Sequence, residues 1–133
     1  MHERNLTRRG HVFLPPDLAA SIPALYATED VPMLEKVVRA HYFVGVCDWW
    51  IFELDPEESR AFGFVCLGDE YSAEAGYIWL SEVEGLVLQV ETEERGKTVP
   101  LALVVERDLG WVPRPVREAI PERFHPYWWK PEE

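Results

Sequence analysis

The sequence has few of the features that mark secreted, membrane-spanning or metal-binding proteins. Its two cysteines, Cys47 and Cys66, lack Cys-x-x-Cys spacing and have no histidines nearby in the pattern of zinc ligands. No apolar run approaches the roughly 18 to 20 residues of a membrane span, and the amino-terminal segment lacks the apolar stretch of a secretory signal. We therefore expect a cytoplasmic protein with no membrane association, no metal or cofactor, and reduced thiols.

Amide side chains are also scarce: the sequence has one asparagine, Asn5, and one glutamine, Gln89. It has eleven prolines. Thermophile proteins often have this composition, although GC-rich coding also produces it. We treat thermophily as a hypothesis, which a melting midpoint in the mesophile range would contradict.

Basic residues are too few to balance the acids, and the net charge is −11. Residues 1–40 carry five acids and five bases, and residues 111–133 carry four of each, so residues 41–110 hold fifteen acids against four bases. A field of this sign repels phosphate backbones. The charge distribution disfavours direct binding of DNA or RNA and favours a partner protein with a basic surface.

Hydrophobic residues, by contrast, make up 47% of the chain, which is enough for one folded domain with its own core. Pro15 and Pro16 predict the start of a short helix in residues 14–27. Runs rich in β-branched and aromatic residues predict strands at 37–44, 48–54, 61–67, 75–80, 86–91 and 98–106. We expect an α+β domain with a largely antiparallel, twisted sheet of five or six strands and short helices on one side.

Local signals add detail to this arrangement. The runs 48–54 and 61–67 should pair with Trp49 opposite Phe64 and with Cys47 near Cys66. Ser81 and Glu84 form a Ser-x-x-Glu pattern that predicts a capped helix start. Gly96 predicts the tip of a second hairpin, which should add two strands to the sheet.

Several short blocks carry a resemblance to a known family. The blocks are IPALYATE (22–29), VVRAHYF (37–43), WWIF (49–52), FGFV (62–65), GYIWLSEVE (76–84) and PLALVVERDLGW (100–111). Together they resemble the domain-of-unknown-function family numbered 2958, whose members are small cytoplasmic proteins of plasmids, phages and other mobile elements. The resemblance implies a context and brings no mechanism. Residues 86–98 and the tail after Val112 depart from the family pattern, so we expect protein-specific function there.

This division gives a domain over residues 1–112 and a Pro- and Trp-rich tail over residues 113–133, which packs on the domain or on a partner.

The triplet Glu106, Arg107 and Asp108 ends a predicted buried strand. It can be read as an acid–base site with an anion-binding Arg, or as strand-end charges that pair while the chain turns. We favour the structural interpretation.

The sequence favours a non-enzymatic, acidic protein-binding module that modulates a host machine such as RNA polymerase or a defence nuclease. The predicted contacts are the acids of the second hairpin and the aromatic residues of the tail, namely Glu91, Glu93, Glu94, Tyr127, Trp128 and Trp129. Two alternatives stay open. One is a DNA-mimic inhibitor of a nucleic-acid-binding protein. The other is a small hydrolase or transferase that uses His41 with nearby carboxylates, or with Cys47 as a nucleophile.

Overall fold

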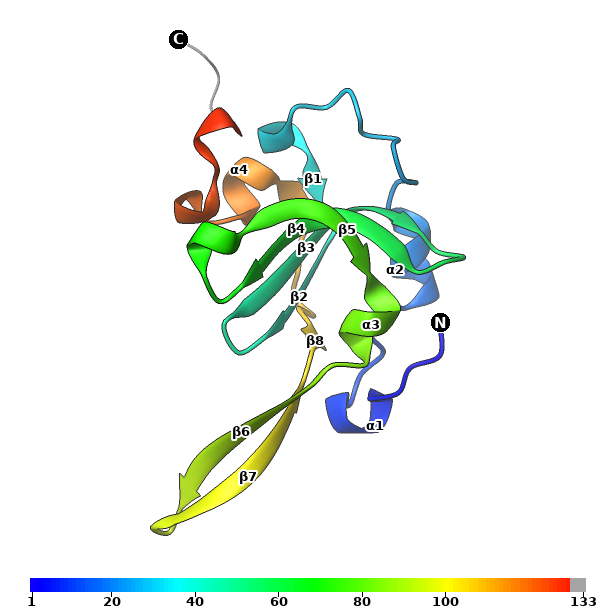
Figure 1. Ribbon diagram of the computed structural model, residues 1–133. Coiled ribbons are helices and arrows are strands. Elements are labelled where there is room, and N and C mark those ends of the chain that lie inside the picture. The colour runs from blue at the N-terminus through cyan, green and yellow to red at the C-terminus, as the bar shows by residue number, and fades with distance from the viewer. Residues whose placement is uncertain (130–133) are drawn as a thin grey trace.

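The computed structural model describes residues 1–129 and has a five-stranded antiparallel sheet at its centre (Figure 1). The strands lie in the order β5-β4-β3-β2-β8. Their bounds are Glu74–Trp79 (β5), Arg60–Leu67 (β4), Cys47–Asp55 (β3), Ala40–Val44 (β2) and Glu106–Arg107 (β8). Strands β2 to β5 follow one another as neighbours, so they form a meander, and β8 joins it at the β2 edge. The predicted α+β class is confirmed.

Short helical segments and two small sheets complete the fold. One small sheet pairs β1 (Val37–Val38) with β9 (Arg114–Pro115), and the other pairs β6 (Val87–Glu94) with β7 (Lys97–Val104). The α-helices are α1 (Leu6–Arg9), α2 (Pro16–Ser21), α3 (Leu80–Glu84) and α4 (Val116–Ala119). The 3-10 turns are η1 (Met33–Glu35), η2 (Glu70–Ser72), η3 (Glu122–Phe124) and η4 (Tyr127–Trp129). Helix α2 starts at the predicted prolines, with Pro16 as its first residue.

The inner strands of the central sheet are buried on both faces, and this explains the main errors of the sequence prediction. Trp49 packs in one core cluster with residues of α3, whereas its neighbour Trp50 packs in a second cluster with residues of α4. Helical segments therefore cover both faces rather than one. The predicted register was wrong by one residue, because Phe64 lies opposite Trp50 and Cys66 lies opposite Asp48. When both faces are apolar, alternation of residue type does not select the register.

The second hairpin does not join the central sheet, contrary to the prediction. Strands β6 and β7 pair only with each other and extend away from the body (Figure 1). Their turn has positive φ at Arg95 (53°) and at Gly96 (77°), which is the type I′ geometry of a tight hairpin. We call residues 87–104 the arm.

The predicted Ser81 cap is also wrong. Helix α3 already includes Leu80, and no side chain caps it at Trp79. The backbone N–H of Leu80 instead donates to the carbonyl oxygen of Ser59 in the β3–β4 loop (2.8 Å), so a tertiary contact satisfies the helix start.

The tail covers the second face of the sheet. Trp111 donates from its indole nitrogen to the Val38 carbonyl oxygen (2.9 Å), and the ring of Phe124 packs near Trp50. Trp129 packs edge-on against Phe64, with ring centroids 4.8 Å apart. Phe124 and Trp129 of the tail therefore pack on the domain. Residues 130–133 of the predicted tail segment lie outside the described part of the chain.

Candidate functional site: the arm and the adjoining groove

The base of the arm is held by a buried ion pair between α1 and α3. Arg9 donates from Nη2 to the carboxylate of Glu84 (2.7 Å), just before the arm, and from Nε to the carbonyl oxygen of Val105 (2.7 Å), just after it. Both charged side chains have no solvent exposure. One guanidinium thus ties together the two chain segments that enter and leave the arm. We call this arrangement the clamp.

The amino-terminal segment completes the clamp. Backbone N–H groups of Arg4 and Asn5 donate to the Glu84 carboxylate (2.7 and 2.9 Å), and the Asn5 side chain donates to the Glu84 carbonyl oxygen (2.8 Å). Burial raises the pKa of Glu84, but the hydrogen bonds from Arg9, Arg4 and Asn5 outweigh it, so the pKa lies below its ordinary value. Glu84 therefore holds the clamp together, whereas the sequence pattern assigned it to a helix cap.

The arm has one apolar face and one polar face. Cross-strand pairs share a face, so the register assigns Leu88, Val90, Thr92, Val99, Leu101 and Leu103 to one side. At the base of this apolar face, Leu88 and Leu103 pack against the first core cluster. Farther out, Val90 is 37% exposed and Leu101 is 43% exposed. The apolar face of the arm is thus an extension of the core into solvent.

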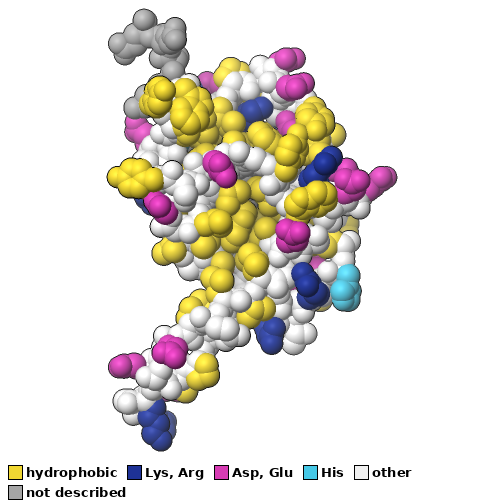
Figure 2. Space-filling model, viewed as in Figure 1, with side chains coloured by type: hydrophobic (Ala, Val, Ile, Leu, Met, Phe, Trp, Pro, Cys, Tyr) yellow, Lys and Arg dark blue, Asp and Glu magenta, His cyan; other side chains and the backbone are white. Residues whose placement is uncertain are grey.

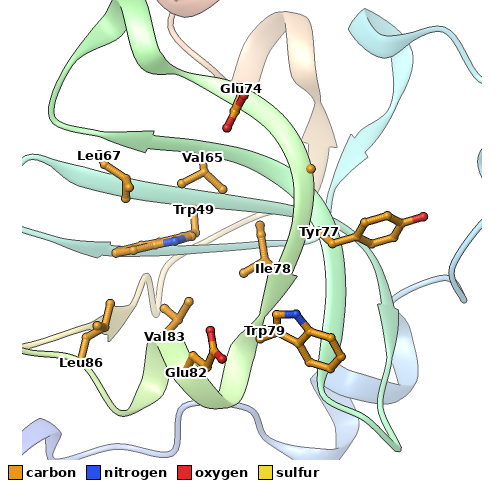
Figure 3. Close-up of a pocket in the computed structure, with 11 residues that line it drawn as sticks. Trp49, Val65, Leu67, Glu74, Tyr77, Ile78, Trp79, Glu82, Val83 and Leu86 are labelled. Atoms are coloured by element: carbon orange, nitrogen blue, oxygen red, sulfur yellow. The ribbon is translucent and has the colours of Figure 1, made fainter.

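An apolar groove adjoins the arm. It has a volume of about 370 Å³ and lies between β5, the ends of β3 and β4, and α3 (Figure 3). Trp49, Ile78 and Val83 point toward one another across it, whereas Tyr77 points away (Figure 3). Hydrophobic side chains continue from this area to the base of the arm (Figure 2). The groove ends at Leu86, one residue before β6 begins.

Acidic side chains border the groove. Glu74 on β5 and Glu82 on α3 are both exposed and line the groove at separate points (Figure 3). Gly76 on β5 lies between them in the lining, and a Cβ atom added there would meet no heavy atom within 4 Å. The groove therefore has open space directly above the backbone of β5.

The predicted contact residues lie on separate surfaces. Glu91 and Glu93 lie on the polar face of the arm, with Pro100 and Thr98 opposite them, whereas Glu94 lies on the apolar side opposite Lys97. The tail is at the other end of the molecule from the tip of the arm (Figure 1).

The predicted aromatic contacts of the tail also differ from one another. Tyr127 is 84% exposed and Trp128 is 69% exposed, while Trp129 packs in the second core cluster. Tyr127 and Trp128 are thus accessible to a partner on a surface of their own.

His41 lies between two carboxylates that the sequence separates widely. Its Nε2 atom is 2.8 Å from Asp48, its Nδ1 atom is 3.1 Å from Asp108, and its ring stacks on Trp50. Both ring nitrogens therefore lie within hydrogen-bond distance of a carboxylate. The adjoining cavity holds only about 50 Å³, the space of one or two water molecules. With both nitrogens engaged by carboxylates of its own chain, His41 has no free nitrogen to accept a proton from a substrate.

The other candidate groups have structural contacts. Burial, and then the charge of Asp48, raises the pKa of Cys47, so its thiol is a poor nucleophile. Arg107 donates from Nε to the carbonyl oxygen of Val12 (3.1 Å), and the backbone N–H of Asp108 donates to the carbonyl oxygen of His41 (2.9 Å). Glu106 is exposed on β8.

Sequence reasoning missed a second buried charged group beside the YATE block. A bulge in β3 between Ile51 and Glu53 directs the Glu53 carboxylate toward the loop, where the backbone N–H groups of Tyr26 (2.8 Å) and Thr28 (3.0 Å) donate to it. The Thr28 hydroxyl donates to Glu53 and accepts from the buried ammonium of Lys36. A cavity of about 290 Å³ adjoins these groups. The YATE block was the only local signal for it.

Comparisons with protein-family models, curated proteins and solved structures found no match. The resemblance to the family numbered 2958 therefore stays a prediction. Within residues 1–129, no helix is long and apolar enough to cross a bilayer. The same part of the chain contains no group of three or more His, Cys, Asp or Glu side chains that could hold a metal ion.

Proposed function

We propose that this protein is a non-enzymatic protein-binding module whose arm contacts a basic surface on a host protein. The observation that carries the proposal is the arm itself, a hairpin held at its base by the clamp, with carboxylates on one face. Two paired strands of eight residues give it a reach of roughly 25 Å. A recognition element that projects from a rigid base loses little conformational entropy on binding.

The polar face of the arm supplies the charge for this contact. Glu91 and Glu93 are exposed, and each of them is free of ion pairs within the described residues. Carboxylates of this kind attract a basic partner and increase the rate of association, while their screening by salt makes the rate depend on ionic strength.

The exposed tail aromatics offer a second contact. Tyr127 and Trp128 are residue types that contribute strongly to binding energy when a partner covers them. A host protein that touches both surfaces would have to span the body of the domain. A phage or plasmid origin, and a target such as RNA polymerase or a defence nuclease, belong to the same proposal and rest on the family resemblance.

The geometry of His41 supports the hydrolase alternative less well. Both ring nitrogens contact carboxylates of the same chain, and the adjoining cavity has little room for a substrate. The DNA-mimic alternative needs an acidic face that competes with nucleic acid, and the experiment below includes that outcome.

The proposal is tested with the full chain as bait in a host extract, followed by kinetic measurements on the purified captured protein. Reversing Glu91 and Glu93 to Lys should slow association about tenfold and flatten its salt dependence. The control reverses Glu57 and Glu58, an exposed pair in the β3–β4 loop, and should have little effect.

Equal association rates for the two double variants would contradict the role of the arm. If the captured protein binds nucleic acid and DNA displaces the bait, mimicry replaces the proposed mode of action. Replacing Trp128 with Ala should chiefly speed dissociation, which separates the contribution of the tail from that of the arm.

A further inference from the structure

The apolar face of the arm needs a cover that residues 1–129 of its own chain do not provide. A two-stranded hairpin alone is only marginally stable in water, and a third strand or a packing surface is needed to stabilise it. Val90 and Leu101 are nevertheless exposed on this face, well beyond the point where Leu88 and Leu103 leave the core. The arm therefore needs an apolar surface that matches this face.

The groove beside α3 is such a site, but the arm cannot reach it within one molecule. The arm leaves the body at the end of the groove and points away from it (Figure 1). The clamp holds both ends of the arm in that direction through the buried contacts of Arg9. A second molecule, however, can bring its arm to the groove from outside.

The charges at the two sites are complementary. Arg95 and Lys97 lie at the tip of the arm, and Glu94 faces Lys97 across the hairpin, so the apolar side of the tip has an excess of one positive charge. Glu74 and Glu82 border the groove as exposed carboxylates. An apolar face whose tip carries one excess positive charge therefore corresponds to an apolar groove with an acidic border, and both belong to the same chain.

We propose that the groove is filled by the arm of a second copy of this chain. In a two-fold dimer, each arm lays its apolar face in the partner's groove, and its tip meets the carboxylates at the border. Such an exchange is self-complementary and closes at two copies. It uses the face of the arm opposite to Glu91 and Glu93, so those carboxylates stay available for a host protein. The two proposals therefore stand or fall separately.

The first experiment measures the oligomeric state of the full chain by sedimentation velocity over a range of concentrations. It is done at 0.15 M salt, where a Debye length of about 8 Å limits repulsion between two chains of net charge −11. We expect a monomer–dimer equilibrium. A wild-type chain that stays monomeric up to millimolar concentration overturns the proposal.

Matched variants locate the contact. Leu101→Lys puts a charge on the apolar face and should weaken dimerisation about 10- to 100-fold, the loss expected for one buried leucine. Ala102→Lys puts the same charge on the other face, opposite Gln89, and should leave dimerisation unchanged. Gly76→Leu should block the groove of a folded chain, because a side chain there meets none of its own atoms within 4 Å at Cβ. Equal dimerisation of the Leu101 and Ala102 variants overturns the proposal.

A charge exchange tests the identity of the occupant. One chain carries Glu94→Lys, Arg95→Asp and Lys97→Glu, which reverses the charge of the tip and keeps opposite charges facing each other across the hairpin, and the other carries Glu74→Lys with Glu82→Lys. Asp before Gly96 suits the type I′ turn, so the first chain keeps its hairpin. Each chain alone should dimerise at least tenfold more weakly than wild type, because like charges meet at both contacts. An equimolar mixture should recover wild-type association, since each tip then meets a border of opposite charge.

Failure of the mixture to recover association overturns the pairing of tip and border. Binding to the captured host protein is measured for wild type, for the dimerisation variants and for the variant in which Glu91 and Glu93 are reversed. A wild-type chain that binds the host protein but stays monomeric would overturn this inference alone. A chain that dimerises, but whose host binding is unaffected by reversal of Glu91 and Glu93, would overturn the proposed function alone.

Discussion

Replacement of Glu84 by Gln should remove a large part of the stability of the fold. The substitution keeps the shape of the side chain but removes its charge. The carboxylate accepts from Arg9, Arg4 and Asn5, and an amide can offer one oxygen to these donors, so at least one donor would face an NH₂ group. The Arg9 guanidinium would then lie buried without its main counter-ion.

The expected magnitude follows from these contacts. Breaking a buried ion pair by removing one partner costs about 3 to 5 kcal/mol. Arg9 keeps a second carboxylate, Glu3, at 3.1 Å, and this residue is nearly buried, so we expect a value near the lower end, about 3 kcal/mol. A domain has a total stability of about 5 to 15 kcal/mol, and for a chain of this size the loss corresponds to a fall of roughly 10 °C in melting temperature.

The assay is urea unfolding at pH 7, followed by the fluorescence of the six tryptophans. The midpoint should fall while the slope m stays constant. Glu118→Gln, which changes an exposed carboxylate on α4, should stay within about 0.5 kcal/mol of wild type. In a double-mutant cycle with Arg9→Met, we expect a coupling free energy of about 2 to 3 kcal/mol. A loss below about 1 kcal/mol for Glu84→Gln would refute the reasoning that the clamp is a tightly paired buried group.

Three further predictions follow from the same structure. The native pKa of Glu84 is lowered, so the stability that its charge contributes is complete above its unfolded pKa of about 4.3 and is lost as the pH falls through the lower native value. The stabilities of wild type and Glu84→Gln should therefore differ by a constant amount near neutral pH and converge as the pH falls below about 4.3. A difference that stays constant in acid would contradict the pairing. Gly63→Ala should lower the free energy of unfolding by about 3 kcal/mol or more, because its Cβ would lie 2.0 Å from a backbone oxygen of β3. Gly76→Ala, at the facing position with open space, should stay within about 1 kcal/mol of wild type. Similar losses for both variants would contradict the close approach at Gly63. Thiol titration of the unfolded, unreduced protein should find both Cys47 and Cys66 free, and fewer than two thiols would indicate a disulfide. In the native protein, Cys47 should react slowly with a thiol reagent at pH 7 and faster as the pH rises, because its pKa is raised.

Local sequence determined the elements themselves. Pro15 and Pro16 mark the start of α2, because proline fits the first turn of a helix and no later position. The runs of β-branched and aromatic residues became strands, and Gly96 lies in the tight turn of the arm. These features depend on backbone preferences over a few residues, so they can be read without knowledge of the rest of the chain.

The register of the central strands was outside the reach of such patterns. Trp49 and Trp50 are adjacent, and each lies in a different core cluster, so hydrophobicity alone did not indicate which of them faces Phe64. The same reason applies to the arm. Its strands have the composition of sheet strands, but their position outside the sheet depends on the clamp, whose two charged residues are 75 positions apart.

Long-range packing also determined the candidate sites. Asp48 and Asp108 reach His41 because β2 lies between β3 and β8, an order that comes from the closure of the whole sheet. The amphipathic character of the arm depends on which residues face each other across the hairpin, and the apolar groove beside it depends on the packing of α3 against β3 and β5. Composition determined that the chain is acidic and rich in core-forming residues. Long-range packing decided which of those residues stayed exposed, because burial is a property of the assembled fold and not of any short segment.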